Sequence, residues 1–494
     1  MKKYGLIIDG REVDAADGKT FRTVNPATGE EVAEVAEAGP ADVDRAVAAA
    51  RRAFRDGSWR KMPATERGKR LSKVADLCFA RLEDLAMLDT LDSGKPLNDT
   101  RNVDVPMGAE FIEYYAGMCD KILGNTYPVS PTMHNYSVRA PYGVAGIITP
   151  WNYPFLIEAY SVAPAIAAGN TCVLKAPELT PMSAVEFGRI CLEAGIPEGV
   201  VNVVPGIGAV AGEHLASHPD VDVVAYTGGT EVGKRILALA APTMKRVILE
   251  CGGKSANIVF PDADLEAAVY YAAFGVFINS GQECVASSRL FLHESIHDEF
   301  VRRLVRITEG IKVGDPLEED TIIGSMASKK QYDKVLRYLD LGKETATLAC
   351  GGSPVTEGKF ARGFFVRPTV FTDVTPDMPI AREEIFGPVL SVMRWRDEED
   401  VIRLANDTPY GLAGAVWTND IARGHSVAER IDAGNVWVNA TCQFHWCAPF
   451  GGVKCSGLGS LMGPGAIDSF TQVKNIWINL SHAPFRWAEK GWKG

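Results

Sequence analysis

Residues 144–154 read Val-Ala-Gly-Ile-Ile-Thr-Pro-Trp-Asn-Tyr-Pro, and this stretch shows the pattern on which the fold depends. An apolar run over 144–148 is followed by a turn bracketed by two prolines, and a helical pattern then covers about 154–168. Parallel strands that are buried on both faces read as continuous apolar runs. The stretch therefore predicts a buried strand whose carboxyl end leads into a helix.

The same strand, turn and helix pattern repeats as far as residue 250. Further strands are predicted at Cys172–Leu174, Val200–Val204, Val223–Tyr226 and Val247–Leu249, separated by helices over about 181–194, 209–217 and 231–240. Such alternation is typical of a doubly wound α/β sheet, which binds ligands at the carboxyl ends of its strands. We therefore expect the functional residues to stand directly after these runs.

The sequence on both sides of this sheet divides into further units. We expect residues 1–123 and 143–250 to form a dinucleotide-binding domain, residues 251–455 a second α/β catalytic domain, and residues 124–142 with 456–494 a small β oligomerisation arm and C-terminal tail. Strands of the second domain are predicted at 289–292, 389–392, 413–417 and 435–438. The alternating stretch 470–479 has no neighbouring strand in the sequence, which predicts pairing with another subunit.

Composition excludes several classes of protein. The 494 residues carry 51 Lys and Arg against 62 Asp and Glu, a net charge of −11, which disfavours nucleic-acid binding. No apolar run reaches the roughly 18 residues of a membrane span, and the amino-terminal run is too short for a signal peptide. Ten cysteines without a Cys-x-x-Cys pair indicate reduced thiols in a cytoplasmic protein. Cys442, Cys447, Cys455 and His445 match no zinc spacing, so we expect packing there and no metal.

Polar residues and glycines follow each predicted strand. In chain order these are Asn152, Lys175-Ala176-Pro177-Glu178, Gly206-x-Gly208-x-x-x-Gly212, Thr227-Gly228-Gly229-Thr230 and Glu250-Cys251-Gly252-Gly253-Lys254, and Gly281-Gln282-Glu283-Cys284 precedes a later strand. Taken singly, each has an ordinary structural explanation as a turn, a solvated carboxylate or a buried thiol. Two glycine-rich helix starts on adjacent strands favour pyrophosphate binding, because helix amino termini attract anions.

Six ordered motifs together resemble the NAD(P)-dependent aldehyde dehydrogenase superfamily over nearly the whole chain. They are Pro150–Pro154, Lys175–Glu178, Leu249–Lys254, Gly281–Cys284, Glu383-Glu384-Ile385-Phe386-Gly387-Pro388 and Pro449-Phe450-Gly451-Gly452-Val453-Lys454. The resemblance implies that Cys284 is the nucleophile that forms a thiohemiacetal with the aldehyde. It implies that Asn152 and the Cys284 backbone N–H hold the oxyanion, and that Glu250 activates the water that hydrolyses the thioester.

The resemblance also implies a cofactor site and a substrate tunnel. The expected cofactor-binding residues are Ile148, Thr149, Trp151, Lys175, Glu178, Gly208, Gly229, Glu384 and Phe386. The expected tunnel residues are Met107, Tyr153, Tyr160, Glu283, Phe444 and Phe450, with Trp446 close by. A carboxylate at Glu178 binds ribose hydroxyls and repels a 2′-phosphate, which favours NAD over NADP. Glu283 would favour a cationic aldehyde if it pointed into the tunnel; we expect it to point away as a satisfied carboxylate.

Three positions depart from the usual family pattern. Gly229 stands where a serine is common, Cys251 stands where a leucine is common, and Leu461 stands where many relatives have a second glutamate, a proposed proton-relay partner of the base. The last departure implies that hydrolysis depends on Glu250 and water alone.

We therefore expect an NAD-dependent, cytoplasmic homodimer or homotetramer that oxidises a neutral aliphatic or aromatic aldehyde. The alternatives are a betaine-aldehyde or amino-aldehyde dehydrogenase, a CoA-acylating relative, an acyl-phosphate reductase, and a structural protein that has lost activity. Glu250 argues against the CoA-acylating enzymes, which generally lack such a base. Intact Cys284, Glu250 and Asn152 argue against a purely structural role.

Overall fold

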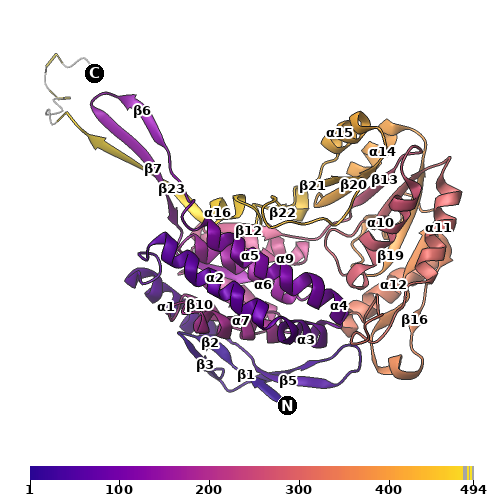
Figure 1. Ribbon diagram of the computed structural model, residues 1–494, viewed down its shortest axis with the longest axis horizontal. Helices are drawn as coiled ribbons and strands as arrows, with labels where there is room; N and C mark the ends of the chain where they lie inside the picture. Colours follow the sequence, from indigo (N-terminus) through magenta and orange to yellow (C-terminus); the bar gives the residue numbers. More distant parts are fainter. Residues whose placement is uncertain (482–486, 489, 492–494) are drawn as a thin grey trace.

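The computed structural model describes residues 1–481, 487–488 and 490–491, and it contains two large sheets and a projecting arm (Figure 1). Residues 482–486, 489 and 492–494 of the predicted C-terminal tail lie outside the described residues. Among the residues described, no helix combines the length and the apolar character that a bilayer span requires.

The first sheet has eight strands, and its centre is the predicted parallel sheet. Their spatial order is β22 (Gly457–Leu458), β12 (Arg246–Glu250), β11 (Val223–Thr227), β8 (Val144–Ile148), β9 (Thr171–Lys175), β10 (Val201–Val203), β2 (Leu6–Ile8) and β3 (Arg11–Val13). The five strands from β12 to β10 are parallel, whereas β22, β2 and β3 are joined antiparallel at the edges. The doubly wound sheet predicted from the apolar runs is thus present.

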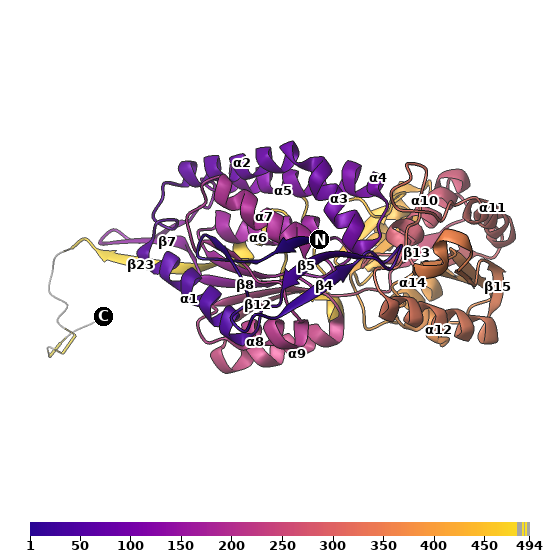
Figure 2. The same cartoon turned by 90° about the horizontal axis from the view of Figure 1, so that it is seen from below.

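Helices cover both faces of this sheet (Figure 2). One face carries α1 (Pro40–Asp56), α8 (Glu213–Ser217) and α9 (Thr230–Ala240), and the other carries α2 (Ala64–Ala80), α3 (Leu82–Ser93), α5 (Val105–Met118), α6 (Pro154–Ala167) and α7 (Met182–Glu193). Every residue of α6 is buried, because that helix lies between the sheet and the outer pair α2 and α5. A separate small sheet of β1 (Lys2–Tyr4), β5 (Glu31–Ala36) and β4 (Thr20–Val24) lies near the amino terminus.

The second sheet has seven strands. Their order is β15 (Thr347–Cys350), β18 (Thr369–Thr372), β19 (Val389–Trp395), β14 (Arg289–His293), β13 (Ala256–Val259), β20 (Ala413–Trp417) and β21 (Asn435–Val438). It is surrounded by α10 (Leu265–Phe277), α11 (His297–Glu309), α12 (Lys329–Thr345), α13 (Pro379–Arg382), α14 (Glu398–Asn406) and α15 (Ile421–Arg430). A two-stranded ribbon, β16 (Pro354–Val355) and β17 (Phe365–Val366), stands beside it.

The arm projects from the first sheet as a three-stranded sheet of β6 (Thr126–Ser130), β7 (Met133–Pro141) and β23 (Thr471–Asn479) (Figure 1). The tail strand therefore has a partner in its own chain: β23 pairs antiparallel with β7 from Thr471 opposite Pro141 to Asn479 opposite Met133. Its other edge bears no strand among the described residues. The start of the predicted tail belongs elsewhere, since β22 pairs with β12 and α16 (Gly465–Ser469) packs on α6.

Short helical turns complete the chain. A single helical turn α4 (Leu97–Asp99) leads into a π-helical turn at Thr100–Asp104, and a second π-helical turn occupies Gly208–Gly212. The 3₁₀ turns are at Ala241–Thr243, Ile278–Gly281, Gly358–Arg362 and Lys454–Ser456. The turn at 278–281 directly precedes the predicted nucleophile, and the turn at 100–104 contributes Asp104, which pairs with buried Lys95.

Candidate active site

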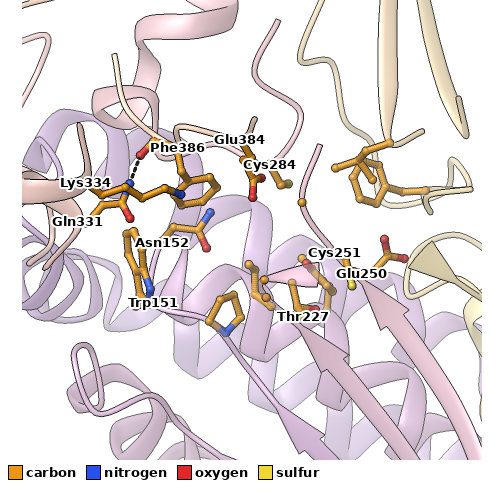
Figure 3. A pocket seen from close by; sticks show the side chains of 18 residues that line it. Trp151, Asn152, Thr227, Glu250, Cys251, Cys284, Gln331, Lys334, Glu384 and Phe386 are labelled. Atoms are coloured by element: carbon orange, nitrogen blue, oxygen red, sulfur yellow. Dashed lines mark hydrogen bonds between the residues drawn. The ribbon is translucent and has the colours of Figure 1, made fainter. Parts of the chain in front are cut away.

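A cavity of about 200 Å³ lies between the two sheets, at the carboxyl ends of β8, β11 and β12. This is the edge where a doubly wound sheet binds its ligands. The cavity brings together the three predicted catalytic residues, Asn152, Glu250 and Cys284 (Figure 3). The complete lining is Pro150, Trp151, Asn152, Ile157, Tyr160, Thr227, Gly228, Gly229, Glu250, Cys251, Gly252, Cys284, Gln331, Lys334, Glu384, Phe386, Leu412 and Phe450.

The loop before Cys284 has an uncommon backbone. Asn279, Ser280 and Gly281 take φ angles of 50°, 56° and 71°, three successive residues in the left-handed region. Such conformations cost free energy at residues other than glycine and persist only where the surroundings hold them. Ser280 Oγ donates to the Gly324 carbonyl at 3.1 Å, and Gln282 Oε1 accepts from the Ala327 N–H at 2.9 Å. The position of Cys284 is therefore fixed by a loop that is anchored to the segment around Gly324 and Ala327.

Asn152 is tied to that same loop. Its Nδ2 donates to the Gln282 carbonyl at 3.0 Å, and its own carbonyl accepts from Asn279 Nδ2 at 2.8 Å. A primary amide carries two N–H groups, and the second one has no hydrogen bond to a described residue. These bonds join the turn after β8 to the Cys284 loop, so the amide and the thiol keep a fixed relation across the two sheets.

Glu250 ends β12 and is buried, with 3% of its surface exposed. Neither of its carboxylate oxygens makes a hydrogen bond to a described residue. Burial raises the pKa of Glu250 well above its usual value, although the nearby N–H groups of Gly452 and Leu461 act in the opposite direction. Leu461 is itself fully buried, and it offers the glutamate only its backbone. The carboxyl group thus lines the cavity, is poorly solvated and makes no hydrogen bond to a described side chain.

Glu283 is also buried, but its carboxylate is fully engaged. One oxygen accepts a hydrogen bond from the Tyr153 hydroxyl, and the other accepts from the Cys284 thiol, with 3.5 Å between sulfur and oxygen. Burial raises the pKa of Glu283, and burial together with the adjacent carboxylate raises that of Cys284 well above the usual thiol value. The side chain is satisfied, as expected, yet it points toward the predicted nucleophile and does not line the cavity.

The side of the cavity opposite Glu250 contains predicted cofactor residues. The rings of Trp151 and Phe386 meet edge to face, with 5.5 Å between centroids, and Glu384 accepts a hydrogen bond from the Gly253 N–H at 3.1 Å. Phe386 has a φ of 60°, rare for so large a residue. Gln331 holds this backbone by donating to the Phe386 carbonyl at 2.7 Å (Figure 3) and to the Ile385 carbonyl at 2.9 Å.

The remaining predicted cofactor residues lie along the same edge of the first sheet. Ile148 and Thr149 are buried at the end of β8, beside Lys175 at the end of β9. Burial lowers the pKa of Lys175 to about 8, and its ammonium lies 3.9 Å from the half-exposed Glu178 carboxylate.

The backbone after β10 and β11 leaves room for a phosphate group. A Cβ added at Gly208 or at Gly229 would meet no atom within 4 Å. The eleven-residue helix α9 starts after Gly229 without a side-chain cap, which leaves its first N–H groups available to an anion. These residues fit a dinucleotide.

The six predicted tunnel residues do not all lie on the cavity. Tyr160 and Phe450 line it, whereas Met107, Tyr153, Glu283 and Phe444 do not. Phe444 packs on Phe450 with ring centroids 5.5 Å apart. A separate hollow of about 660 Å³ is lined by Trp446 with Glu110, Glu113, Tyr114, Gly117, Met118 and Lys121.

Several residues near the cavity were missed by sequence reasoning. Lys254 ends the Leu249–Lys254 motif, and the sequence does not predict its surroundings. Its ammonium is buried without a hydrogen-bonding partner among the described residues, and burial lowers its pKa to about 7. Gln331 and Lys334 come from α12, whose sequence gives no signal for them.

All ten cysteines are free. His445 Nδ1 lies 3.0 Å from Cys447 Sγ, and the described residues contain no group of three side chains suited to a metal.

Comparison with known proteins agrees with this geometry. The profile of the Aldehyde dehydrogenase family matches residues 13–476. The mitochondrial aldehyde dehydrogenase of Homo sapiens is 45% identical over 478 residues, covering 96% of this chain and 92% of the human protein. A solved NAD+ complex of a Bacillus cereus aldehyde dehydrogenase is 45% identical, with a TM-score of 0.95 and 97% of each chain covered. A mutant indole-3-acetaldehyde dehydrogenase of P. syringae, solved with NAD+, is 40% identical, with a TM-score of 0.96 and 97% of each chain covered. The chain belongs to the aldehyde dehydrogenase family.

Proposed function

We propose that this protein oxidises an aldehyde to a carboxylic acid with NAD, through a covalent intermediate on Cys284. The observation that carries the proposal is the meeting of a thiol, an amide and an unpartnered carboxylate, those of Cys284, Asn152 and Glu250, on one cavity beside a dinucleotide cradle. These groups are what acyl transfer through a thiol requires: a nucleophile, an oxyanion donor and a base.

Cys284 begins the reaction by attack on the aldehyde carbonyl carbon, which gives a thiohemiacetal. The second N–H of Asn152, not used by the Gln282 carbonyl, donates to the developing oxyanion. One such donor contributes about 3 kcal/mol to transition-state stabilisation. Trp151, Glu384 and Phe386 would hold NAD on the side of the cavity opposite Glu250. The bound cofactor would supply the hydride acceptor, and loss of the hydride from the former aldehyde carbon converts the Cys284 thiohemiacetal to a thioester.

Glu250 then takes a proton from the water that hydrolyses the thioester. Its geometry is consistent with this role, because no hydrogen bond to a described residue occupies either carboxylate oxygen that would receive the proton. Buried Leu461 offers no carboxylate to pass the proton onward. The proton therefore leaves Glu250 through water.

NAD is the proposed cofactor in preference to NADP. Three of the solved neighbours hold NAD+, and the Glu178 carboxylate lies 3.9 Å from the Lys175 ammonium, where it could bind ribose hydroxyls. The ten free cysteines suit a reducing compartment, and we place the protein in the cytoplasm.

We propose that residues 1–123 and 143–250 form the cofactor-binding domain and that residues 251–455 form the catalytic domain. Residues 457–470 are assigned to the first of these, because β22 joins its sheet.

The proposed substrate is a neutral aliphatic or aromatic aldehyde. Tyr160 and Phe450 present apolar surface at the cavity, and the P. syringae neighbour is named for an aromatic aldehyde. An amino-aldehyde or trimethylammonio-aldehyde is the second candidate. It is favoured by the hollow at Trp446 and Tyr114, whose rings lie 5.0 Å apart beside the carboxylates of Glu110 and Glu113.

We also propose a homodimer or homotetramer. No described residue pairs with the outer edge of β23, and Val473, Trp477 and Ile478 are exposed on that strand. An exposed apolar edge strand of this kind is suited to pairing with another copy. Light scattering at micromolar concentration tests the proposal, and a monodisperse monomer would overturn it.

The test of the reaction is NADH formation from a panel of neutral and cationic aldehydes, with and without CoA. Cys284→Ala should abolish NADH formation while NAD still binds. CoA-dependent product would indicate the acylating reaction, and a preference for a trimethylammonio aldehyde over its neutral isostere would select the second candidate. Turnover of Cys284→Ala within tenfold of the parent would contradict the covalent route.

A further inference from the structure

The thiol of Cys284 has one hydrogen-bond acceptor among the described residues, and it is the carboxylate of the preceding residue. Glu283 Oε1 lies 3.5 Å from Cys284 Sγ and at the same distance from the Val285 backbone nitrogen. The other carboxylate oxygen accepts from the Tyr153 hydroxyl. Glu250, by contrast, makes no hydrogen bond to a described residue. The carboxylate in contact with the thiol is therefore that of Glu283.

A buried cation stands behind this carboxylate. Lys95 Nζ lies 3.5 Å from the centroid of the Tyr153 ring and 2.6 Å from the Asp104 carboxylate, and both side chains are almost fully buried. The charge of Lys95 lowers the pKa of Glu283, which burial alone would raise further. Tyr153 adds to this effect by donating its hydroxyl to the charged form. Two features thus favour an ionised Glu283 in an apolar setting.

Burial raises the pKa of the Cys284 thiol well above its usual value, so the free thiolate is scarce near neutral pH. A thiol in that condition needs a base to take its proton as it attacks. A carboxylate at contact distance provides one without first forming a separated, buried thiolate. The loop that leads into this pair has three successive left-handed residues, and the 3.5 Å contact between sulfur and carboxylate shows that the two side chains lie on the same side.

We propose that Glu283 is the general base that activates Cys284 for attack on the aldehyde. The inference rests on the proposed function. As the S–C bond forms, the S–H bond breaks, the thiol proton passes to Glu283 Oε1, and the carbonyl π electrons pass to the oxygen facing Asn152. When water later displaces the thiol from the thioester, the Glu283 carboxylic acid returns its proton to the departing sulfur. Glu250 receives the proton from the water, so the two glutamates serve different halves of the cycle.

If Glu283 only holds its neighbours in place, removing its charge should change the alkylation rate of Cys284 in the opposite direction. A negative charge beside a thiol opposes its ionisation, so removing that charge from a carboxylate with no base function would increase the thiolate and speed its reactions. Loss of a base slows them instead. Alkylation of Cys284 by iodoacetamide distinguishes the two, and it needs neither an aldehyde nor a cofactor.

The experiment compares the parent with Glu283→Gln at pH 7, following alkylation of the Cys284 peptide by mass spectrometry, so that exposed Cys447 does not interfere. Glu344→Gln, which removes an exposed carboxylate far along α12, is the matched control. We expect alkylation of Cys284 to fall at least about tenfold in Glu283→Gln, in line with base catalysis, and to stay within about twofold in the control. The pre-steady-state burst of NADH with propanal should slow in parallel.

Chemical rescue guards against a variant that is merely misfolded. In Glu283→Ala, formate should restore part of the alkylation rate in a concentration-dependent manner, which a structural role would not produce. Alkylation that is unchanged or faster in Glu283→Gln, or no rescue by formate in a folded Glu283→Ala, overturns the proposal. A parent that forms no NADH with any aldehyde, yet shows slowed alkylation in Glu283→Gln, would refute the proposed function and leave this assignment standing.

Discussion

Glu250 ends a strand of the first sheet and Glu283 precedes a strand of the second sheet, and their carboxyl groups are held in opposite ways near the Cys284 thiol. Glu250 has no hydrogen-bonding partner among the described residues. Glu283 follows a left-handed loop and has a partner on each oxygen, with the cation of Lys95 behind Tyr153. Burial raises the pKa of both. The difference shows how two neighbouring carboxyl groups can be kept for separate tasks: one lines the cavity with both oxygens unpaired among the described residues, and the other is held against the sulfur.

The largest effect that would sharpen this contrast is expected from Glu250→Gln. The variant should retain the burst of NADH, because attack and hydride transfer do not use Glu250, while steady-state turnover falls by about 10²–10⁴-fold. Stopped-flow absorbance followed by a steady-state assay measures both in one sample. Equal loss of the burst and of turnover would place Glu250 before hydride transfer and remove the division of labour.

Lys95→Met tests whether the cation supports the Glu283 side. Removing one member of a buried pair leaves Asp104 charged and unpartnered, at a cost of about 3–5 kcal/mol in the free energy of unfolding. Lys69→Met is the control, since Lys69 forms an exposed pair with Glu66 at 2.7 Å, and such pairs contribute about 0–1 kcal/mol. Urea unfolding of the two variants gives the comparison. A similar decrease in the free energy of unfolding in both variants would mean that the buried pair stabilises the protein no more than the exposed one.

Tyr153→Phe removes the hydroxyl bond to Glu283 and leaves the ring over Lys95 in place. Hydrogen bonds to charged groups contribute about 1.5–3 kcal/mol, so the free energy of unfolding should decrease by about that amount. Tyr127→Phe, which removes a 3.2 Å hydroxyl contact to Ser137 on the exposed arm, should change it by less than about 0.5 kcal/mol. An unaltered stability in Tyr153→Phe would show that Glu283 is held by its other contacts.

The smallest effect concerns pH. The base must be ionised to act, and burial raises the pKa of Glu250 well above its usual value. Hydrolysis should therefore slow as pH falls through and below that raised pKa, by tenfold per unit. Steady-state rates from pH 5 to 9 should show this acid limb in the parent, and Glu250→Gln should lose it. A flat parent profile across that range would mean that Glu250 is not the group that limits hydrolysis.

Sequence patterns were most informative where local chemistry decides structure. The apolar runs at 144–148 and 223–226 predicted buried parallel strands, and both are present as β8 and β11. The polar residues after them lie on one cavity because parallel strands end at the same edge. The direction of Glu283 could not be read from its position, since it depends on the left-handed turn that begins at Asn279.

Long-range pairing accounts for most of what the sequence did not show. Gln331 reaches the Phe386 backbone from α12, a contact that joins residues 55 positions apart. β22 joins the first sheet beside β12 although it follows the second domain in the chain. The tail strand alternates as an edge strand should, but its period says nothing about its partner, and β7 of the same chain fills that place. Such contacts are set by the assembled fold and leave no local signal.

The pairing of β7 with β23 also sets an order of events during synthesis. Asn135 donates to Asn475 at 2.7 Å across these strands, with 340 positions between them. At roughly 5–20 residues per second, a ribosome needs about 20–70 s to make the intervening chain. Through that interval β7 has an unpaired edge, a form of strand prone to wrong pairing. Only a chain translated past residue 479 can close the arm, so its completion distinguishes finished polypeptides from truncated ones.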